Sequence, residues 1–288
     1  MSQFSVLTLP FMQRAVVALV FSSMTLSLLG IVVLVFNLAA VRFALMHMGL
    51  LGATVGLATG TDPTMAGLAA ITGGAFLLGP VSDRTRLDTG AASAFFMTGS
   101  LAIAFILLYK ANIPAMDAFS VFTGSVLMLT PTDMWTLLLL GTCVVLAMVI
   151  WYWEINLVLY NRDLAAALGV NTRLIYYVLL VFLGLAIGIA MKLVGALMVD
   201  AIVLLPAMVA LPLSRSLRQA LLLTSLIGGA SSMVGIAASL TWDWPISASV
   251  TIAGVLAVFV GQMVQYVIRR LRMQQEDLPH ASKGSAKR

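Results

Sequence analysis

Long apolar stretches separated by short polar turns dominate the pattern of hydrophobic and polar positions along this chain. An α-helix needs about 20 apolar residues to cross a bilayer core that is about 30 Å thick. Nine stretches approach that length, and a weaker one near 117–130 predicts only an interfacial or re-entrant helix. We predict membrane spans near residues 16–38, 43–59, 65–82, 91–110, 134–152, 175–192, 194–212, 219–240 and 247–268.

The composition also indicates a membrane protein. Of the 288 residues, 61% are hydrophobic and 9% are charged, whereas an ordinary soluble domain carries about 25% charged residues. A water-soluble core of this size cannot cover so much apolar surface. We therefore predict an all-α fold, a polytopic membrane helix bundle of about 8–9 transmembrane helices. The single cysteine, Cys143, excludes an internal disulfide and a cysteine-cluster metal site within one chain.

The positions of lysine and arginine predict the orientation of the bundle. If the N-terminus lies outside, thirteen of these residues fall on one side of the membrane and three on the other. The richer side is expected to be cytoplasmic, and the C-terminus lies there too. We divide the chain into an N-terminal, possibly interfacial segment (1–15), a single transmembrane domain (16–272) and a polar tail (273–288) that we expect to be disordered.

One connection is longer than a bundle of membrane helices requires. Residues 153–174 carry a short helical pattern, with Asp163 near its start and Gly169 at its end. On the predicted topology this element is cytoplasmic. It is either a simple turn between two spans or a surface by which a cytoplasmic partner holds the protein.

Two ionisable side chains, His47 and Asp200, fall inside stretches that otherwise read as lipid-soluble helix. A charge at the centre of a membrane helix costs about 2.5–3.5 kcal/mol even on the lenient insertion scale. Such residues therefore mark candidate positions on a transport pathway, although a histidine that only bonds a carbonyl within the bundle is the simpler alternative.

Five segments, in order along the chain, carry motifs of a known family. They are LDTGAAS (87–93), FTGSVLMLTPTDMW (122–135), RDLAAALGV (162–170), AIGIAMKLVGALMVDAIVLLPAMVA (186–210) and WDWPISASV (242–250). Together they resemble the membrane permease subunits of the zinc/manganese/iron class of ABC importers, from about residue 15 to 268. The resemblance implies a multi-pass protein of the bacterial cytoplasmic (inner) membrane.

The resemblance also implies a function and a set of partners. The chain would form the pathway for a divalent metal cation (zinc, manganese or iron) that is cargo, with no permanently bound cofactor. An external solute-binding protein would deliver the metal, and a second permease chain, identical or different, would complete the pathway. A separate ATPase would dock on the 153–174 element through Asp163, Ala166 and Gly169, because the chain has no G-x-x-x-x-G-K-[ST] phosphate loop and is not itself an enzyme.

The metal-binding pattern of the family is only half present. The second span of such permeases usually carries G-D-x-x-x-H, which places a carboxylate and an imidazole on one helix face. Zinc and manganese accept such mixed ligands. Here His47 is present, but Phe43 occupies the acidic position and Arg42 the glycine.

Asp200 is then an unexpected carboxylate on another helix. We considered that it supplies a second station on the path, that it shares one site with His47, or that it is structural and pairs with Lys192 or a serine. Counting residues from the expected span ends separates His47 and Asp200 by roughly 10–15 Å in depth.

Three readings of function compete. A secondary transporter that uses Asp200 as a proton or ion carrier is the main alternative to the importer, and an intramembrane enzyme is a weaker one. The acids at the outer loops, Asp117, Asp133 and Asp243, either receive a cation from outside or, more simply, cap helices and turns.

Overall fold

Eleven helices make up the described part of the chain in the computed structural model, which describes residues 9–85, 87–114, 116 and 130–283. Nine of these described helices are long and apolar enough to cross a membrane. They are α1 (Pro10–Val35), α2 (Ala39–Thr59), α3 (Pro63–Thr85), α4 (Thr89–Lys110), α6 (Pro131–Ile150), α9 (Thr172–Val194), α10 (Ala196–Leu213), α11 (Leu217–Trp242) and α12 (Ile246–Lys283). The predicted all-α bundle and its nine spans are thus confirmed.

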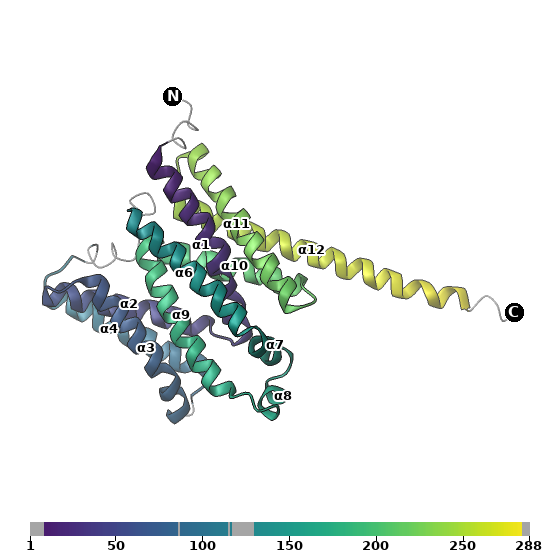
Figure 1. Cartoon of the computed structure of the whole chain (residues 1–288), viewed down its shortest axis with the longest axis horizontal. Helices are drawn as coiled ribbons and strands as arrows, with labels where there is room; N and C mark the ends of the chain where they lie inside the picture. Colours follow the sequence, from purple (N-terminus) through teal and green to yellow (C-terminus); the bar gives the residue numbers. More distant parts are fainter. Residues whose placement is uncertain (1–8, 86, 115, 117–129, 284–288) are drawn as a thin grey trace.

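The membrane helices form two groups that Figure 1 displays on either side of α9. In one group α2 packs against both α3 and α4, and α9 lies along α3. In the other, α1 packs against α6, α10 and α11, while α12 closes on α10 and α11. The groups meet mainly along α9, and α2 has little contact with α10.

Glycine permits the closest helix approaches within each group. A Cβ atom on Gly30 of α1 would clash with the carbonyl oxygen of Val203 on α10, and one on Gly52 of α2 with that of Ala66 on α3. Small residues allow membrane helices to pack at such short range. Each group is therefore a tightly packed unit.

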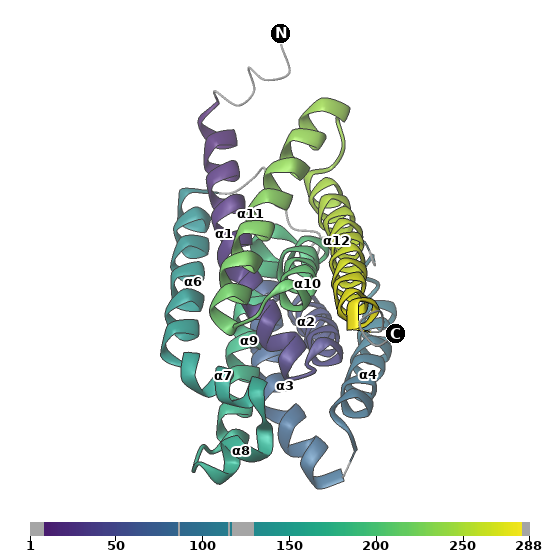
Figure 2. The same cartoon turned by 90° about the vertical axis from the view of Figure 1, so that its right-hand side faces the viewer.

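Two short helices, α7 (Tyr152–Tyr160) and α8 (Arg162–Ala167), lie between α6 and α9. Figure 2 shows them at one end of the bundle, with the first turn of α1 at the opposite end. The predicted short helical element between the two spans is present. It comprises two helices, not one, since the chain breaks at Asn161, which has an extended backbone.

The last helix departs from the sequence prediction. We expected the final span to end near residue 268 and the residues after Arg272 to form a disordered tail, but α12 continues as a helix to Lys283. In Figure 1 it extends well beyond the other helices. Most of residues 273–278 favour helix intrinsically, so the polar sequence does not by itself end the helix. The weak stretch near 117–130 lies almost wholly outside the described residues.

Candidate cation site and coupling element

His47 lies in the third turn of α2 and is half-buried. Its Nδ1 atom lies 2.8 Å from the carbonyl oxygen of Phe43, one turn earlier. A carbonyl oxygen only accepts hydrogen bonds, so Nδ1 must carry the proton, and a neutral ring then keeps a lone pair on Nε2. Metal-binding histidines commonly orient themselves through this kind of bond to a backbone carbonyl. The contact therefore suits a ligand as well as a structural histidine.

Asp200, in the second turn of α10, forms an ion pair with Arg42 of α2. The Nη1 group of Arg42 donates a hydrogen bond to Oδ1 of Asp200. The Arg42 side chain is 1% exposed and that of Asp200 is 27% exposed. The carboxylate thus has a fixed positive partner on its buried side and keeps an accessible part.

The partner of Asp200 corrects one sequence prediction, which named Lys192 or a serine. Lys192 lines a small cavity with Pro63 and Thr64 instead, and its charge acts on Asp62. We had counted Arg42 among the basic residues that flank spans, but α2 already begins at Ala39 and buries it. Removing Arg42 from the count leaves the basic excess on the same side.

The depth estimate for Asp200 also changes. Asp200 contacts Arg42, whose Cα lies five residues before His47, or about 7–8 Å along α2. The estimate counted residues from the expected span ends and did not include the ion pair, which links the two helices directly.

Phe43 completes a cluster that we call the polar cluster: Arg42, Phe43, His47 and Asp200. The guanidinium carbon of Arg42 lies 4.6 Å from the centre of the Phe43 ring, which is a cation–π distance. The Nε atom of Arg42 is buried without a hydrogen-bond partner. Sequence reasoning missed Arg42. The available signal was a basic residue directly before the predicted span at 43–59, together with an acid inside the predicted span at 194–212.

The polar cluster has the donor chemistry for a divalent cation but not a complete site. Carboxylate oxygen and imidazole nitrogen are ligands that zinc and manganese accept. Within the described residues, however, no three His, Cys, Asp or Glu side chains gather. His47 and Asp200 would therefore need water, backbone oxygen or another chain to complete a coordination shell.

The predicted coupling residues lie on and after α8. Asn161 caps this helix, because its side-chain oxygen accepts a hydrogen bond from the backbone N–H of Leu164. Ala165 is buried, whereas the next residue, Ala166, is exposed. Gly169 follows the helix with a φ of 83°, a left-handed conformation that favours glycine. Asp163 is in the first turn.

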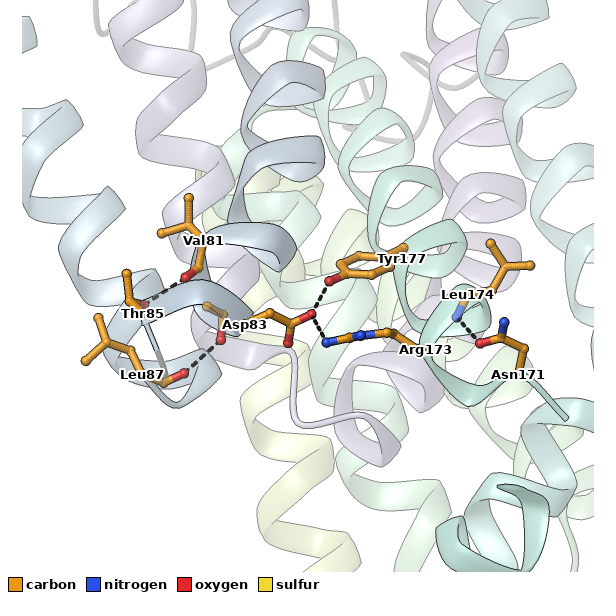
Figure 3. Close-up of polar contacts among 9 residues, drawn as sticks. Val81, Asp83, Thr85, Leu87, Asn171, Arg173, Leu174 and Tyr177 are labelled. Atoms are coloured by element: carbon orange, nitrogen blue, oxygen red, sulfur yellow. Dashed lines mark hydrogen bonds and ion pairs between the residues drawn. The ribbon is translucent and has the colours of Figure 1, made fainter. Parts of the chain in front are cut away.

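Polar contacts connect the chain after α8 to α3, as Figure 3 shows. Asn171 caps α9 at the backbone N–H of Leu174. Two residues later, Nη2 of Arg173 lies 2.7 Å from Oδ2 of Asp83 on α3, and the Tyr177 hydroxyl donates to the same oxygen. The pair is exposed, so it contributes about 0–1 kcal/mol. It does fix the start of α9 beside the end of α3.

Of the remaining acidic residues near loops, those in the described part of the chain cap helices or turns. Thr130 and Asp133 form a capping box at the start of α6. Asp243 follows α11 with a φ of 55° and ends that helix. Asp62 accepts a hydrogen bond from the backbone N–H of Thr64, which is the largest cause of its lowered pKa. Asp117 lies outside the described residues.

Nine candidate spans in the described part of the chain are typical of a multi-pass membrane protein. Residues 8–265 match the model of the ABC 3 transport family. The chain belongs to this family, which confirms the resemblance found in its motifs. It is a permease subunit of an ABC transporter complex and is not itself the ATPase.

Two relatives named for manganese transport align with most of the chain, and one named for zinc uptake aligns with about half of it. The manganese transport system membrane protein MntC of Halalkalibacterium halodurans is 26% identical over 248 residues, which cover 85% of this chain and 84% of MntC. The manganese import system permease protein ScaB of Streptococcus gordonii is 21% identical, and the match covers 91% of this chain and 95% of ScaB. The high-affinity zinc uptake system membrane protein ZnuB of Buchnera aphidicola is 30% identical, and the match covers 49% of this chain and 54% of ZnuB.

A solved structure has the same fold. A chain of the PsaBC–Fab complex, with PsaBC from Streptococcus pneumoniae, superposes with a TM-score of 0.75 at 21% identity. The superposition covers 90% of this chain and 94% of that chain. The two chains thus share the same overall fold.

Proposed function

We propose that this permease imports a divalent metal cation, manganese or zinc, through a pathway that passes the polar cluster. The family match over residues 8–265 carries the proposal, together with relatives named for manganese and zinc transport. The imidazole of His47 and the carboxylate of Asp200 supply ligand atoms of the right kind. Iron, the third metal of the sequence prediction, has no support among the relatives described above.

We propose the partners and the orientation of the complex on the same basis. A cytoplasmic ATPase would drive transport, a second permease chain would complete the pathway, and an extracytoplasmic binding protein would deliver the metal. The end of the bundle that carries α7 and α8 would face the cytoplasm of a bacterial cell, and the N-terminus the outside. The first turn of α1 lies at the opposite end from α8, which supports this orientation (Figure 2).

The experiment for this function is uptake by the complete complex in proteoliposomes. We expect manganese or zinc to accumulate only when ATP is present on the side of the ATPase, and a proton or sodium gradient alone to drive none. Gradient-driven uptake without ATP would instead establish the secondary transporter. In that mechanism Asp200 would carry a proton, but its carboxylate is already held by the fixed charge of Arg42, which does not favour that role.

A docking role for α8 predicts a clear effect of Ala166→Trp. Ala166 is exposed, so an indole is accommodated by the isolated permease but obstructs a partner surface on this helix. We expect metal-stimulated ATP hydrolysis to fall to the background of the uncoupled ATPase, while the thermal unfolding temperature of the permease stays near that of the wild type.

The matched control is Ala111→Trp, which places the same side chain at an exposed alanine directly after α4. This variant should couple normally. If Ala166→Trp retains metal-stimulated hydrolysis, α8 is not part of the docking surface.

A further inference from the structure

The Arg42–Asp200 pair is the only ion pair between the two helix groups in the described part of the chain. The other described pair, Arg173–Asp83, joins α9 to α3 within one group. The backbones of α2 and α10 otherwise make little contact, so the pair is a direct polar link across the boundary between the two groups. A charged bridge at such a boundary links the position of α2 to that of α10.

The pair is also incompletely formed. One nitrogen of Arg42 bonds one carboxylate oxygen, and the buried Nε atom of Arg42 has no hydrogen-bond partner. Arginine binds a carboxylate most strongly when two parallel bonds form, and here only one exists. A single bond is easier to exchange for another cation than a bidentate pair.

Arg42 keeps favourable surroundings if it leaves Asp200. Its guanidinium already lies over the Phe43 ring, a contact of about 0.5–2 kcal/mol for a cation. Arg42 is the fourth residue of α2, so its long side chain can reach toward the interface at the start of that helix. The aromatic contact therefore offsets part of the cost of separating the guanidinium from Asp200, and the bound divalent cation would have to supply the rest.

We propose that Arg42 is a tethered cation that occupies the Asp200 carboxylate until a transported divalent cation replaces it. The inference rests on the proposed function, since it treats Asp200 as part of the cation pathway. Cargo would bind between Asp200 and the Nε2 atom of His47 and release Arg42 toward Phe43. The bridge between α2 and α10 would open in the same step.

Replacement of Arg42 at the Asp200 carboxylate also favours divalent over monovalent cations. A monovalent ion brings the same single charge as the guanidinium and offers no charge-assisted hydrogen bond in return. A divalent ion brings twice the charge and gains an imidazole ligand as well. Arg42 is thus a specificity-determining residue that excludes sodium and potassium from the carboxylate.

Metal binding by the purified complex tests this proposal, with Arg42→Gln as the main variant and Arg42→Lys as the charge-preserving control. A nearby opposite charge changes the proton affinity of a carboxylate by about 10- to 1000-fold. We therefore expect Arg42→Gln to bind zinc about tenfold more tightly than the wild type or better, and Arg42→Lys to bind it with nearly wild-type affinity. Added sodium should weaken zinc binding in Arg42→Gln and leave the wild type unchanged.

A purely structural ion pair predicts the opposite sign, because the loss of Arg42 would then loosen the site. Unchanged or weaker zinc binding by Arg42→Gln overturns the proposal, even if the wild-type complex transports zinc or manganese normally. If the wild type neither binds nor transports these metals, the proposed function itself fails. The two failures are thus distinguishable.

A second measurement leaves the polar cluster intact and serves if Arg42→Gln does not fold. Spin labels are attached to Val55→Cys on α2 and Leu197→Cys on α10, two exposed positions, with Cys143→Ser removing the natural thiol. Saturating zinc should shift the distance distribution between the labels. An unchanged distribution with zinc bound overturns the proposal.

Discussion

Asp200→Asn is expected to destabilise the permease by about 3 kcal/mol, because it leaves the guanidinium of Arg42 buried without its counter-ion. Removing one partner of a buried ion pair costs about 3–5 kcal/mol. The 27% exposure of the Asp200 side chain places the effect at the lower end. Thermal unfolding of the purified permease in detergent measures it as a lower transition temperature.

Two control variants separate the lost charge from the lost side chain. In Arg42→Met combined with Asp200→Leu, both charges disappear together, and replacing a buried pair by apolar residues is often neutral or stabilising. Asp83→Asn breaks the exposed pair with Arg173 and should cost less than about 1 kcal/mol. An Asp200→Asn protein as stable as the wild type would mean that Arg42 has another partner.

His47→Ala is expected to lower metal transport by at least about 100-fold at limiting metal concentration while the protein remains folded. Loss of an outer partner of a metal ligand already costs about 10- to 100-fold in affinity or activity, and the variant removes the proposed ligand itself. Initial rates of zinc uptake by the reconstituted complex measure the effect.

The matched control for His47 is Val55→Ala, which shortens another exposed side chain of α2 about two turns after His47 and outside the polar cluster. Val55→Ala should therefore retain most of the zinc uptake. Wild-type uptake by His47→Ala would show that the imidazole is only a structural group in the bundle.

Helix positions could be predicted from the sequence because membrane spans depend on local hydropathy. The expected span at 43–59 became α2 at Ala39–Thr59, and the one at 219–240 became α11 at Leu217–Trp242. The four extra residues at the start of α2 mattered, since they moved Arg42 from a loop into a buried turn. Small errors in helix ends therefore changed the interpretation of a charge.

The candidate site could be predicted only in part. Hydropathy identified His47 and Asp200 as unusual, and the family motif identified Phe43 as the position of a missing acid. The pairing of Arg42 with Asp200 joins residues 158 positions apart on helices of different groups. No local pattern reports which helices are neighbours in space, so the pair required the structure.

The position of Asp200 suggests that it replaces the carboxylate absent at Phe43. The family pattern has an acid one turn before the histidine, whereas this chain has Arg42, Phe43 and a carboxylate that reaches Arg42 from α10. An acid at position 43 would adjoin both Arg42 and His47. It could therefore supply the negative charge from α2 itself.

Zinc uptake by Asp200→Asn, alone and combined with Phe43→Asp, tests the central claim that a relocated carboxylate works with His47. We predict that Asp200→Asn alone loses at least about 90% of ATP-driven uptake, on the scale of a lost metal ligand. The double variant should recover uptake to within several-fold of the wild type, because the charge returns to the same cluster. A folded double variant that remains inactive, or a fully active Asp200→Asn protein, would contradict the account.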